Sequence, residues 1–135
     1  MRILAIDYGA KKIGLAVSDP TQTIAQPYGV VDNLPSTIKQ LARLCQNEAV
    51  GLVVMGEPIR LNRSANPILK STQAFASRLI KATGLPLVWQ PEWFTTTEVR
   101  RLVGPRQHER LDAAAAALIL TGYLEQQKHN TSHHA

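Results

Sequence analysis

Two apolar runs joined by a short polar turn, within residues 4–19, constrain the fold more than any other part of the chain. Residues 2–7 and 13–18 are rich in β-prone aliphatic side chains, and Gly9 lies between them, which predicts a β-hairpin. Asp7 ends the first run. A carboxylate among buried neighbours is costly unless it is hydrogen-bonded, paired or bound to a cation. Asp7 therefore either accepts hydrogen bonds within the turn, as is common for Asp-x-Gly, or binds a cation.

The length and composition predict one globular domain. With 135 residues, 44% of them hydrophobic, the chain can bury a core of its own. We expect this domain to span residues 1–125 and the polar residues 126–135 to form a frayed tail. No apolar run approaches the ~20 residues of a membrane span, and the first residues lead into a strand without a signal-peptide pattern. A cytoplasmic protein without membrane partners is expected.

The charge and the single cysteine restrict the chemistry only mildly. A formal net charge of +5 and a pI near 9.7 favour polyanionic partners. Cys45 has no partner for an internal disulfide, and its position in an apolar helical pattern predicts a small core residue rather than a nucleophile.

The remaining patterns predict a mixed α/β sheet. Further strands are expected over residues 24–31, 50–55 and 85–89, and helices over residues 38–45, 64–83, 95–102 and 111–124. Pro27 predicts an edge position or a bulge for its strand, whereas the uninterrupted apolar run 50–55 predicts a central strand beside the first. We therefore expect three antiparallel strands followed by two parallel ones, with helices on both faces of a five-stranded sheet.

Four motifs occur in a fixed order along the chain. They are Ala-Ile-Asp-Tyr-Gly-x-Lys-x-Ile-Gly-Leu-Ala from Ala5, Gly-x-Pro from Gly56 with Pro67 beyond it, Glu-x-x-Thr-Thr-x-Glu-x-Arg from Glu92, and Leu-Asp-x-x-Ala-Ala from Leu111. In type, order and spacing they resemble the YqgF family of RNase H-fold nucleases, also called RuvX-like. The resemblance covers essentially the whole chain.

The resemblance implies an RNase H-like domain in which three acidic residues converge at one end of the sheet. The matching positions are Asp7, Glu92 and Asp112, expected to be catalytic and to bind Mg²⁺ or Mn²⁺. Family members are described as Holliday junction resolvases and as nucleases that trim the 5′ end of precursor 16S rRNA. Phosphodiester hydrolysis suits such residues, because hard cations held by carboxylates offset phosphoryl charge, activate water and stabilise the leaving alkoxide.

Each acid also has an ordinary structural interpretation. Taken singly, Glu92 is typical of an exposed loop carboxylate, and Asp112 is typical of a residue that caps an alanine-rich helix. Taken together with Asp7, at the ends of two strands and the start of a helix, they are better interpreted as one metal site.

Basic residues fall on the connections expected to surround these acids. They are Lys11 and Lys12 in the hairpin turn, Arg60 and Arg63 after the strand 50–55, and Arg101, Arg106 and Arg110 before the last helix. Contact with a nucleic-acid backbone and plain solvated charge are equally good interpretations.

The chain departs from the family pattern near Glu92 and at two other places. Pro91 and Trp93 flank Glu92 where the family usually has Asp-Glu-Arg, and Asn-Arg at 62–63 replaces Asp-Gly. Trp93 either stacks on a base or, as we prefer, packs against the helix 95–102. Glu57, where many members have Leu, is a carboxylate facing the proposed site, either as a compensating ligand or as a loop charge.

Three functions follow from these observations. The first is a metal-dependent nuclease acting on structured RNA, precursor 16S rRNA above all. The second is a resolvase of branched DNA with the same chemistry, which requires a stable homodimer, so monomer and homodimer both remain open. The third is a nucleotide- or nucleic-acid-binding protein without nuclease turnover, because Asp-x-Gly-x-Lys is similar to the phosphate loop of actin-like ATPases.

Overall fold

The computed structural model describes residues 1–57, 67–91 and 105–133, and within them the side chains of residues 1–57, 68–91 and 112–130. The strands are β1 (Arg2–Asp7), β2 (Lys12–Ser18), β3 (Ala25–Asp32), β4 (Val50–Glu57) and β5 (Leu87–Pro91), and the helices are α1 (Thr37–Asn47), α2 (Pro67–Thr83) and α4 (Pro105–His133). In this part of the chain, no helix is long and apolar enough to span a membrane.

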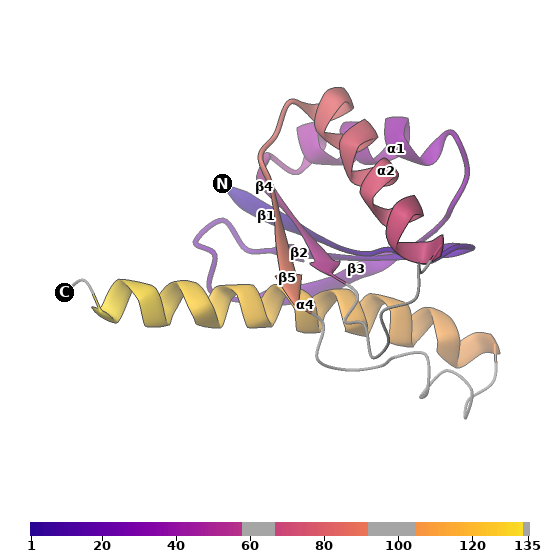
Figure 1. The fold of residues 1–135 in the computed structure, drawn as a ribbon. Helices are drawn as coiled ribbons and strands as arrows, with labels where there is room; N and C mark the ends of the chain where they lie inside the picture. Colours follow the sequence, from indigo (N-terminus) through magenta and orange to yellow (C-terminus); the bar gives the residue numbers. More distant parts are fainter. Residues whose placement is uncertain (58–66, 92–104, 134–135) are drawn as a thin grey trace.

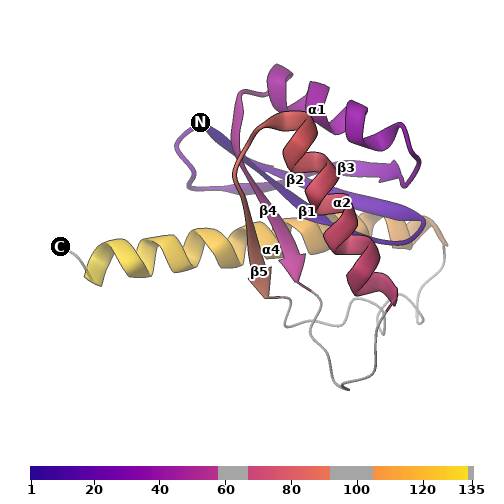
Figure 2. The ribbon, with the colours of Figure 1, turned by 45° about the horizontal axis from the view of Figure 1, so that its top comes forward.

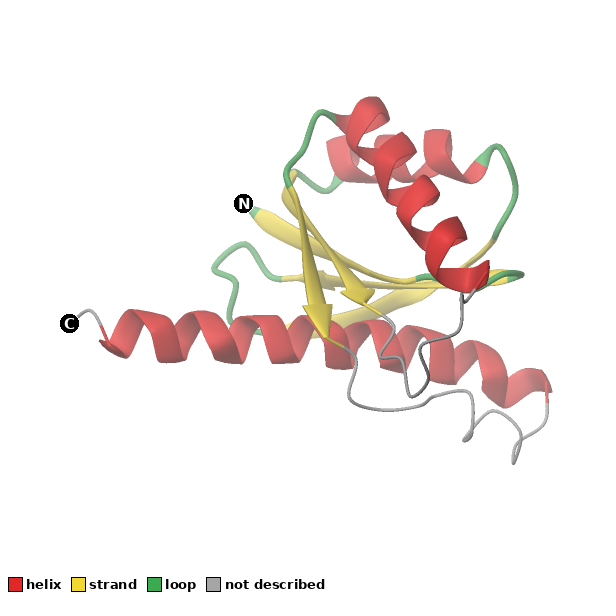
Figure 3. Ribbon diagram, viewed as in Figure 1, coloured by secondary structure: helices red, strands yellow, loops and turns green. Residues whose placement is uncertain are grey.

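The strands form one mixed sheet in the order β3-β2-β1-β4-β5. β1, β2 and β3 pair antiparallel, whereas β4 and β5 run parallel to β1. Helices α1 and α2 cover one face and the long helix α4 crosses the other (Figures 1 and 2). Figure 3 shows the same arrangement as a yellow sheet between red helices. This confirms the predicted fold class, including the central position of β4 beside β1.

Strand β3 is an edge strand and it carries a bulge. Leu15 of β2 pairs with Gly29, but the next residue, Ala16, pairs with Pro27, so that Tyr28 is the extra residue of β3. Pro27 lacks the N–H that a central strand would need. Both features predicted from this proline are therefore present.

The hairpin turn between β1 and β2 is tied to the chain that follows β3. The side-chain amide of Asn33 donates a hydrogen bond to the Gly9 carbonyl at 2.8 Å, and the Asn33 backbone N–H donates to the Lys11 carbonyl at 2.9 Å. These two bonds fix the turn that follows Asp7.

Alternation along β1 divides its side chains between two cores. Leu4 and Ile6 belong to the core under α1 and α2, and Ile3 and Ala5 belong to the core under α4. Because successive strand residues point to opposite faces, the next odd-numbered residue of β1, Asp7, lies on the α4 face.

Helix α4 is longer than predicted at both ends. It begins at Pro105 rather than at residue 111, and it continues to His133, so residues 126–133 are helical rather than a frayed tail. Proline is favoured at a first helical position. Residues 106–110 include Arg, Gln and Glu, and residues 126–128 are Gln, Gln and Lys, all of them good helix formers. The C-terminal part of α4 extends beyond the sheet in Figure 1, and the side chains of residues 125–130 are exposed.

Helix α2 and strand β5 differ from expectation in smaller ways. Phe75, Ala76 and Leu79 form the buried stripe of α2 as predicted, but Ile80 is 43% exposed at its rim. Gly84 follows the helix with a φ of +68°, which suits its predicted role as a stop. β5 starts two residues later than predicted, because the Leu85 N–H bonds back to the hydroxyl of Thr83. The predicted helix 95–102 lies outside the described residues.

Candidate active site

Asp7 is the last residue of β1 and only 6% of it is exposed. It lies at the end of the strand that pairs with β2 on one side and β4 on the other, so its backbone position is fixed by the centre of the sheet. Burial of a carboxylate in such a place requires specific partners or a cation.

Asp112 is also buried, with 6% exposed. Because α4 begins at Pro105, Asp112 lies about two turns inside the helix and not at its start. The interpretation of Asp112 as a helix cap is therefore wrong. An aspartate in the interior of a helix has poor helix propensity, so its burial here favours a role on the sheet-facing side.

Gly14 brings these two acids together. In the antiparallel pairing of β1 and β2, Asp7 and Gly14 are direct partners. A Cβ atom at Gly14 would lie 2.0 Å from the backbone carbonyl oxygen of Asp112 and 2.4 Å from its carbonyl carbon. Helix α4 thus touches the bare backbone of β2 at Gly14, one strand away from Asp7. The backbones of both buried aspartates therefore lie next to Gly14 on the α4 side of the sheet.

The third predicted acid, Glu92, lies outside the described residues, but the strand before it is well defined. β5 ends at Pro91, paired with the end of β4, and the carboxyl ends of β1, β4 and β5 meet at one edge because these strands are parallel. Val88 packs in the core under α4, and Gln90 is 5% exposed with its amide close to Gly122 of α4.

Glu57 does not share the face of Asp7. Val53 and Met55 of β4 belong to the core under α1 and α2, and the same alternation places the exposed Glu57 on that face, away from α4. The expectation that Glu57 faces the proposed site is corrected by this register, which favours its interpretation as a surface charge.

The basic residues are only partly described. Lys11 is exposed in the hairpin turn, and Lys12 is exposed at the start of β2, where its ammonium group forms an ion pair with Asp32 of β3. Arg60, Arg63 and Arg101 lie outside the described residues. Arg106 belongs to the first turn of α4, and only its backbone is described.

Cys45 is a core residue, as predicted. It lies on the buried side of α1 with 4% of its surface exposed, and burial raises the pKa of its thiol to about 11. A thiol with so high a pKa is a poor nucleophile at neutral pH.

Among the described side chains, no three His, Cys, Asp or Glu residues gather around a possible metal position, and Glu92 is not among those side chains. Asp7 and Asp112 supply two carboxylates, the hard oxygen ligands that Mg²⁺ prefers. The residue that the sequence reasoning overlooked is Gly14. A glycine inside a predicted strand signals close approach of another backbone or a ligand, and that signal was available in the Ile-Gly-Leu-Ala motif.

Comparison with known proteins identifies the family of this chain. The family profile described as "RuvX: Holliday junction resolvase" matches residues 1–126. A protein of Brucella ovis named "Putative pre-16S rRNA nuclease" is 35% identical over 131 residues, which cover 91% of this chain and 81% of that protein.

Two solved structures share the fold at low sequence identity. RuvC of Thermus thermophilus superposes with a TM-score of 0.59 at 16% identity, covering 94% of this chain and 97% of RuvC. The Fowlpox virus resolvase, solved with Holliday junction DNA, gives a TM-score of 0.56 at 12% identity, covering 94% of this chain and 99% of the resolvase. With the family match over residues 1–126, these likenesses show that the chain is an RNase H-like nuclease and belongs to the RuvX family.

Proposed function

We propose that this nuclease hydrolyses phosphodiester bonds of structured RNA, at the 5′ end of precursor 16S rRNA, and that Asp7, Asp112 and Glu92 form its catalytic site. The observation that carries the proposal is the pair of buried aspartates beside Gly14, both 6% exposed and contributed by a central strand and the helix that crosses it. The name of the Brucella ovis relative supports the choice of substrate. Trimming of ribosomal RNA would place the protein in the cytoplasm.

The donor set fits a divalent cation, Mg²⁺ or Mn²⁺. Carboxylates are the ligands that these ions take from proteins. The burial of Asp7 and Asp112 on a central strand and a packed helix would limit their movement before an ion binds. When bound, such an ion supplies Lewis acidity toward the phosphoryl group and an activated water. Asp7 and Asp112 would hold it, with Glu92 as a third ligand.

The residues of the chain would orient the substrate around this pair. Lys11, exposed in the turn that follows Asp7, would contact a backbone phosphate close to the scissile bond. Lys12 would do so only in competition with Asp32, its ion-pair partner. Arg60, Arg63, Arg101 and Arg106 are proposed to extend this phosphate contact on the loops around the carboxyl ends of the strands.

The proposed function is tested by cleavage assays on a precursor 16S rRNA fragment, a four-way DNA junction and a single-stranded RNA of mixed sequence, with Mg²⁺, Mn²⁺ or a chelator. We expect metal-dependent cleavage of the rRNA fragment at a defined position and loss of this cleavage in the Asp7→Asn variant. Binding of the fragment with no cleavage under any of these metals would contradict the proposal and would favour a binding protein without turnover.

A second candidate function is resolution of branched DNA. Two observations favour it: the description of the matching family as a Holliday junction resolvase, and the fold shared with the Fowlpox virus resolvase. Resolution requires two symmetric cuts and hence two copies of the site. Sedimentation in the presence of the junction distinguishes the candidates, because a resolvase would bind it as a dimer, whereas an RNA-trimming enzyme needs one copy.

A further inference from the structure

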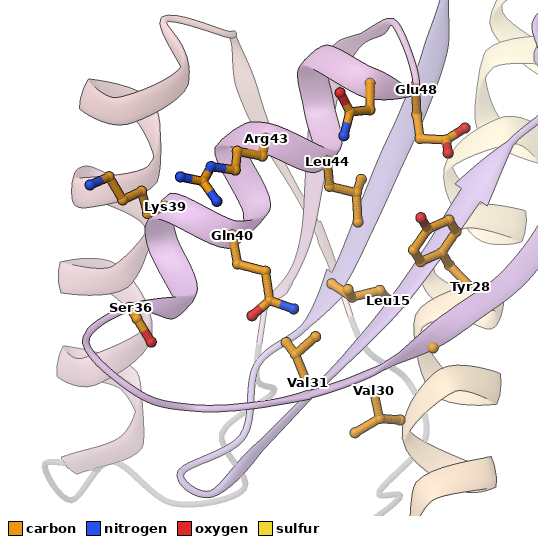
Figure 4. Close-up of a pocket in the computed structure, with 12 residues that line it drawn as sticks. Leu15, Tyr28, Val30, Val31, Ser36, Lys39, Gln40, Arg43, Leu44 and Glu48 are labelled. Carbon is orange, nitrogen blue, oxygen red and sulfur yellow. The ribbon is translucent and has the colours of Figure 1, made fainter.

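A groove of about 700 Å³ lies between helix α1 and the edge strand β3, on the sheet face opposite to the buried aspartates (Figure 4). Its volume falls in the range of pockets that hold small ligands, ~300–1,000 Å³. None of the residues assigned to the proposed catalytic site lines it. The groove is therefore a separate feature of the surface.

The walls of the groove differ in chemistry. Tyr28, the bulged residue of β3, forms one wall and is 50% exposed. The opposite wall is α1, from which Leu44 and Gln40 point toward the interior, and Leu15 and Val31 lie between the walls (Figure 4). The interior thus offers an aromatic face, an apolar floor and an amide.

The outer rim of the groove is cationic. Lys39 and Arg43 lie one turn apart on α1 and are both exposed, and Figure 4 shows their side chains extending from α1 on the side away from β3 and Tyr28. Among the described residues that line the groove, the acidic one is Glu48, and Arg2 neutralises it through an ion pair of 3.1 Å. The rim therefore has a positive charge with no acidic side chain left to balance it.

We propose that this groove binds a single-stranded segment of the RNA substrate, with a base against Tyr28 and the neighbouring phosphates at Lys39 and Arg43. This inference rests on the proposed function and adds a binding site to it. A nucleotide combines a flat, stackable base with a charged phosphate, and proteins that bind single strands pair aromatic faces with a cationic track in the same way. A duplex is a poor ligand for this groove, because its bases are stacked on one another and offer no free face to Tyr28.

The groove leads toward the proposed catalytic site. Its β3 wall continues through Val31 to Asp32, which are paired with Ile13 and Lys12 of β2. Lys11 and Lys12 belong to the hairpin whose first strand ends at Asp7. An RNA strand that leaves the groove along β3 would pass Asp32, whose carboxylate is paired with Lys12, and then Lys11 in the hairpin turn, before it reaches the buried aspartates around the edge of the sheet.

A protein segment added to the edge of β3 is the less favoured occupant. Strand addition needs a regular row of backbone donors and acceptors. In β3 the missing N–H of Pro27 and the bulge at Tyr28 interrupt that row. Strand addition would also leave Lys39 and Arg43 of the cationic rim without a function, because pairing with β3 uses backbone groups only.

The test measures the affinity of the full-length protein for a short fluorescent oligouridine in the presence of a chelator, which prevents cleavage. Tyr28→Ala should weaken binding about ten-fold or more, the loss expected when one base-stacking contact disappears, and Tyr28→Phe should bind like the wild type because it keeps the ring. The double variant Lys39→Ala, Arg43→Ala should reduce the slope of log affinity against log salt by about 1.4, at ~0.7 per phosphate contact in a single strand.

The matched control is the double variant Lys70→Ala, Arg78→Ala, which removes the same charge from exposed positions of α2. Thermal unfolding is measured for every variant to check that it is folded. If Tyr28→Ala and the Lys39→Ala, Arg43→Ala variant bind RNA as tightly as this control, the groove proposal is wrong. Cleavage of precursor rRNA by the wild type would not rescue it. If these variants lose binding as expected but no RNA is cleaved, the groove is supported and the proposed nuclease substrate is contradicted.

Discussion

Replacement of Gly14 by alanine is predicted to damage stability and catalysis together, because this glycine lets α4 contact the sheet beside Asp7. The added Cβ would lie 2.0 Å from the Asp112 carbonyl oxygen and 3.2 Å from the Ala113 nitrogen, whereas ordinary contacts begin near 3.4 Å. These atoms belong to the helix backbone, so no side chain can rotate away. The helix has to retreat by about 1.4 Å at this point to restore an ordinary contact.

The expected magnitudes follow from that displacement. Overpacking of this kind costs about 1–3 kcal/mol, which corresponds to a fall of roughly 4–12 °C in the unfolding temperature of a domain of this size. A displacement of about 1 Å in a catalytic group costs on the order of 100-fold in rate. Cleavage, measured well below the unfolding temperature so that the variant is fully folded, should fall by about that factor.

Gly29→Ala is the matched control for stability. Gly29 is in the adjacent strand β3, and a Cβ atom there would meet nothing within 4 Å. The unfolding temperature of the Gly29→Ala variant should stay constant or rise slightly, because alanine is favoured over glycine in a strand. A Gly14→Ala variant with the unfolding temperature and cleavage rate of the wild type would refute the close-packing argument.

Two further predictions concern the basic loops and the acid dependence of folding. Replacement of Arg60 and Arg63 by alanine should reduce the slope of log affinity against log salt by about 0.9 per lost contact with duplex phosphate, and an unchanged slope would assign both arginines to bulk solvent. In the loop between β2 and β3, hydrogen bonds from the hydroxyl of Thr21 and from the backbone N–H of Ile24 hold the pKa of Asp19 below its ordinary value. The stabilisation from this carboxylate is therefore present above the unfolded-state pKa of ~3.9 and is lost as the pH falls below it. Urea unfolding should show the wild type losing stability below about pH 4 more steeply than Asp19→Asn, and parallel curves would contradict the assignment.

The sheet could be predicted from the sequence because its strands carry strong local patterns. The uninterrupted apolar run of β4 required a central strand, and Pro27 required an edge or a bulge. The length of α4 was underestimated, because the polar residues around its alanine-rich centre have helix propensity without the apolar periodicity that indicates burial.

The sequence motifs predict which residues form the candidate site but not how the helix and the strands meet there. The motifs indicated Asp7 and Asp112, yet the helix start at Pro105 and the contact with Gly14 depend on how α4 crosses the sheet, which no local pattern encodes. The face on which Glu57 lies depends on the register of β4 relative to the core. A shift of one residue in the expected alternation moves a side chain to the opposite face of the sheet.

We propose above that Asp7 and Asp112 form one cation-binding site for phosphodiester cleavage. The most direct test compares the wild type with Asp7→Asn and Asp112→Asn in two measurements: cleavage of a precursor 16S rRNA fragment, and the rise in unfolding temperature caused by Mg²⁺. Glu125→Gln, which removes an exposed carboxylate from the same helix as Asp112, is the matched control.

Asparagine keeps the shape of each aspartate and removes a negative charge from a crowded acidic region, so metal-free stability should hold or rise. We expect both variants to lose cleavage and the Mg²⁺-induced stabilisation that comes from binding to the folded state, while Glu125→Gln keeps both. Full cleavage by either asparagine variant, with the Mg²⁺-induced stabilisation unchanged, would contradict the account.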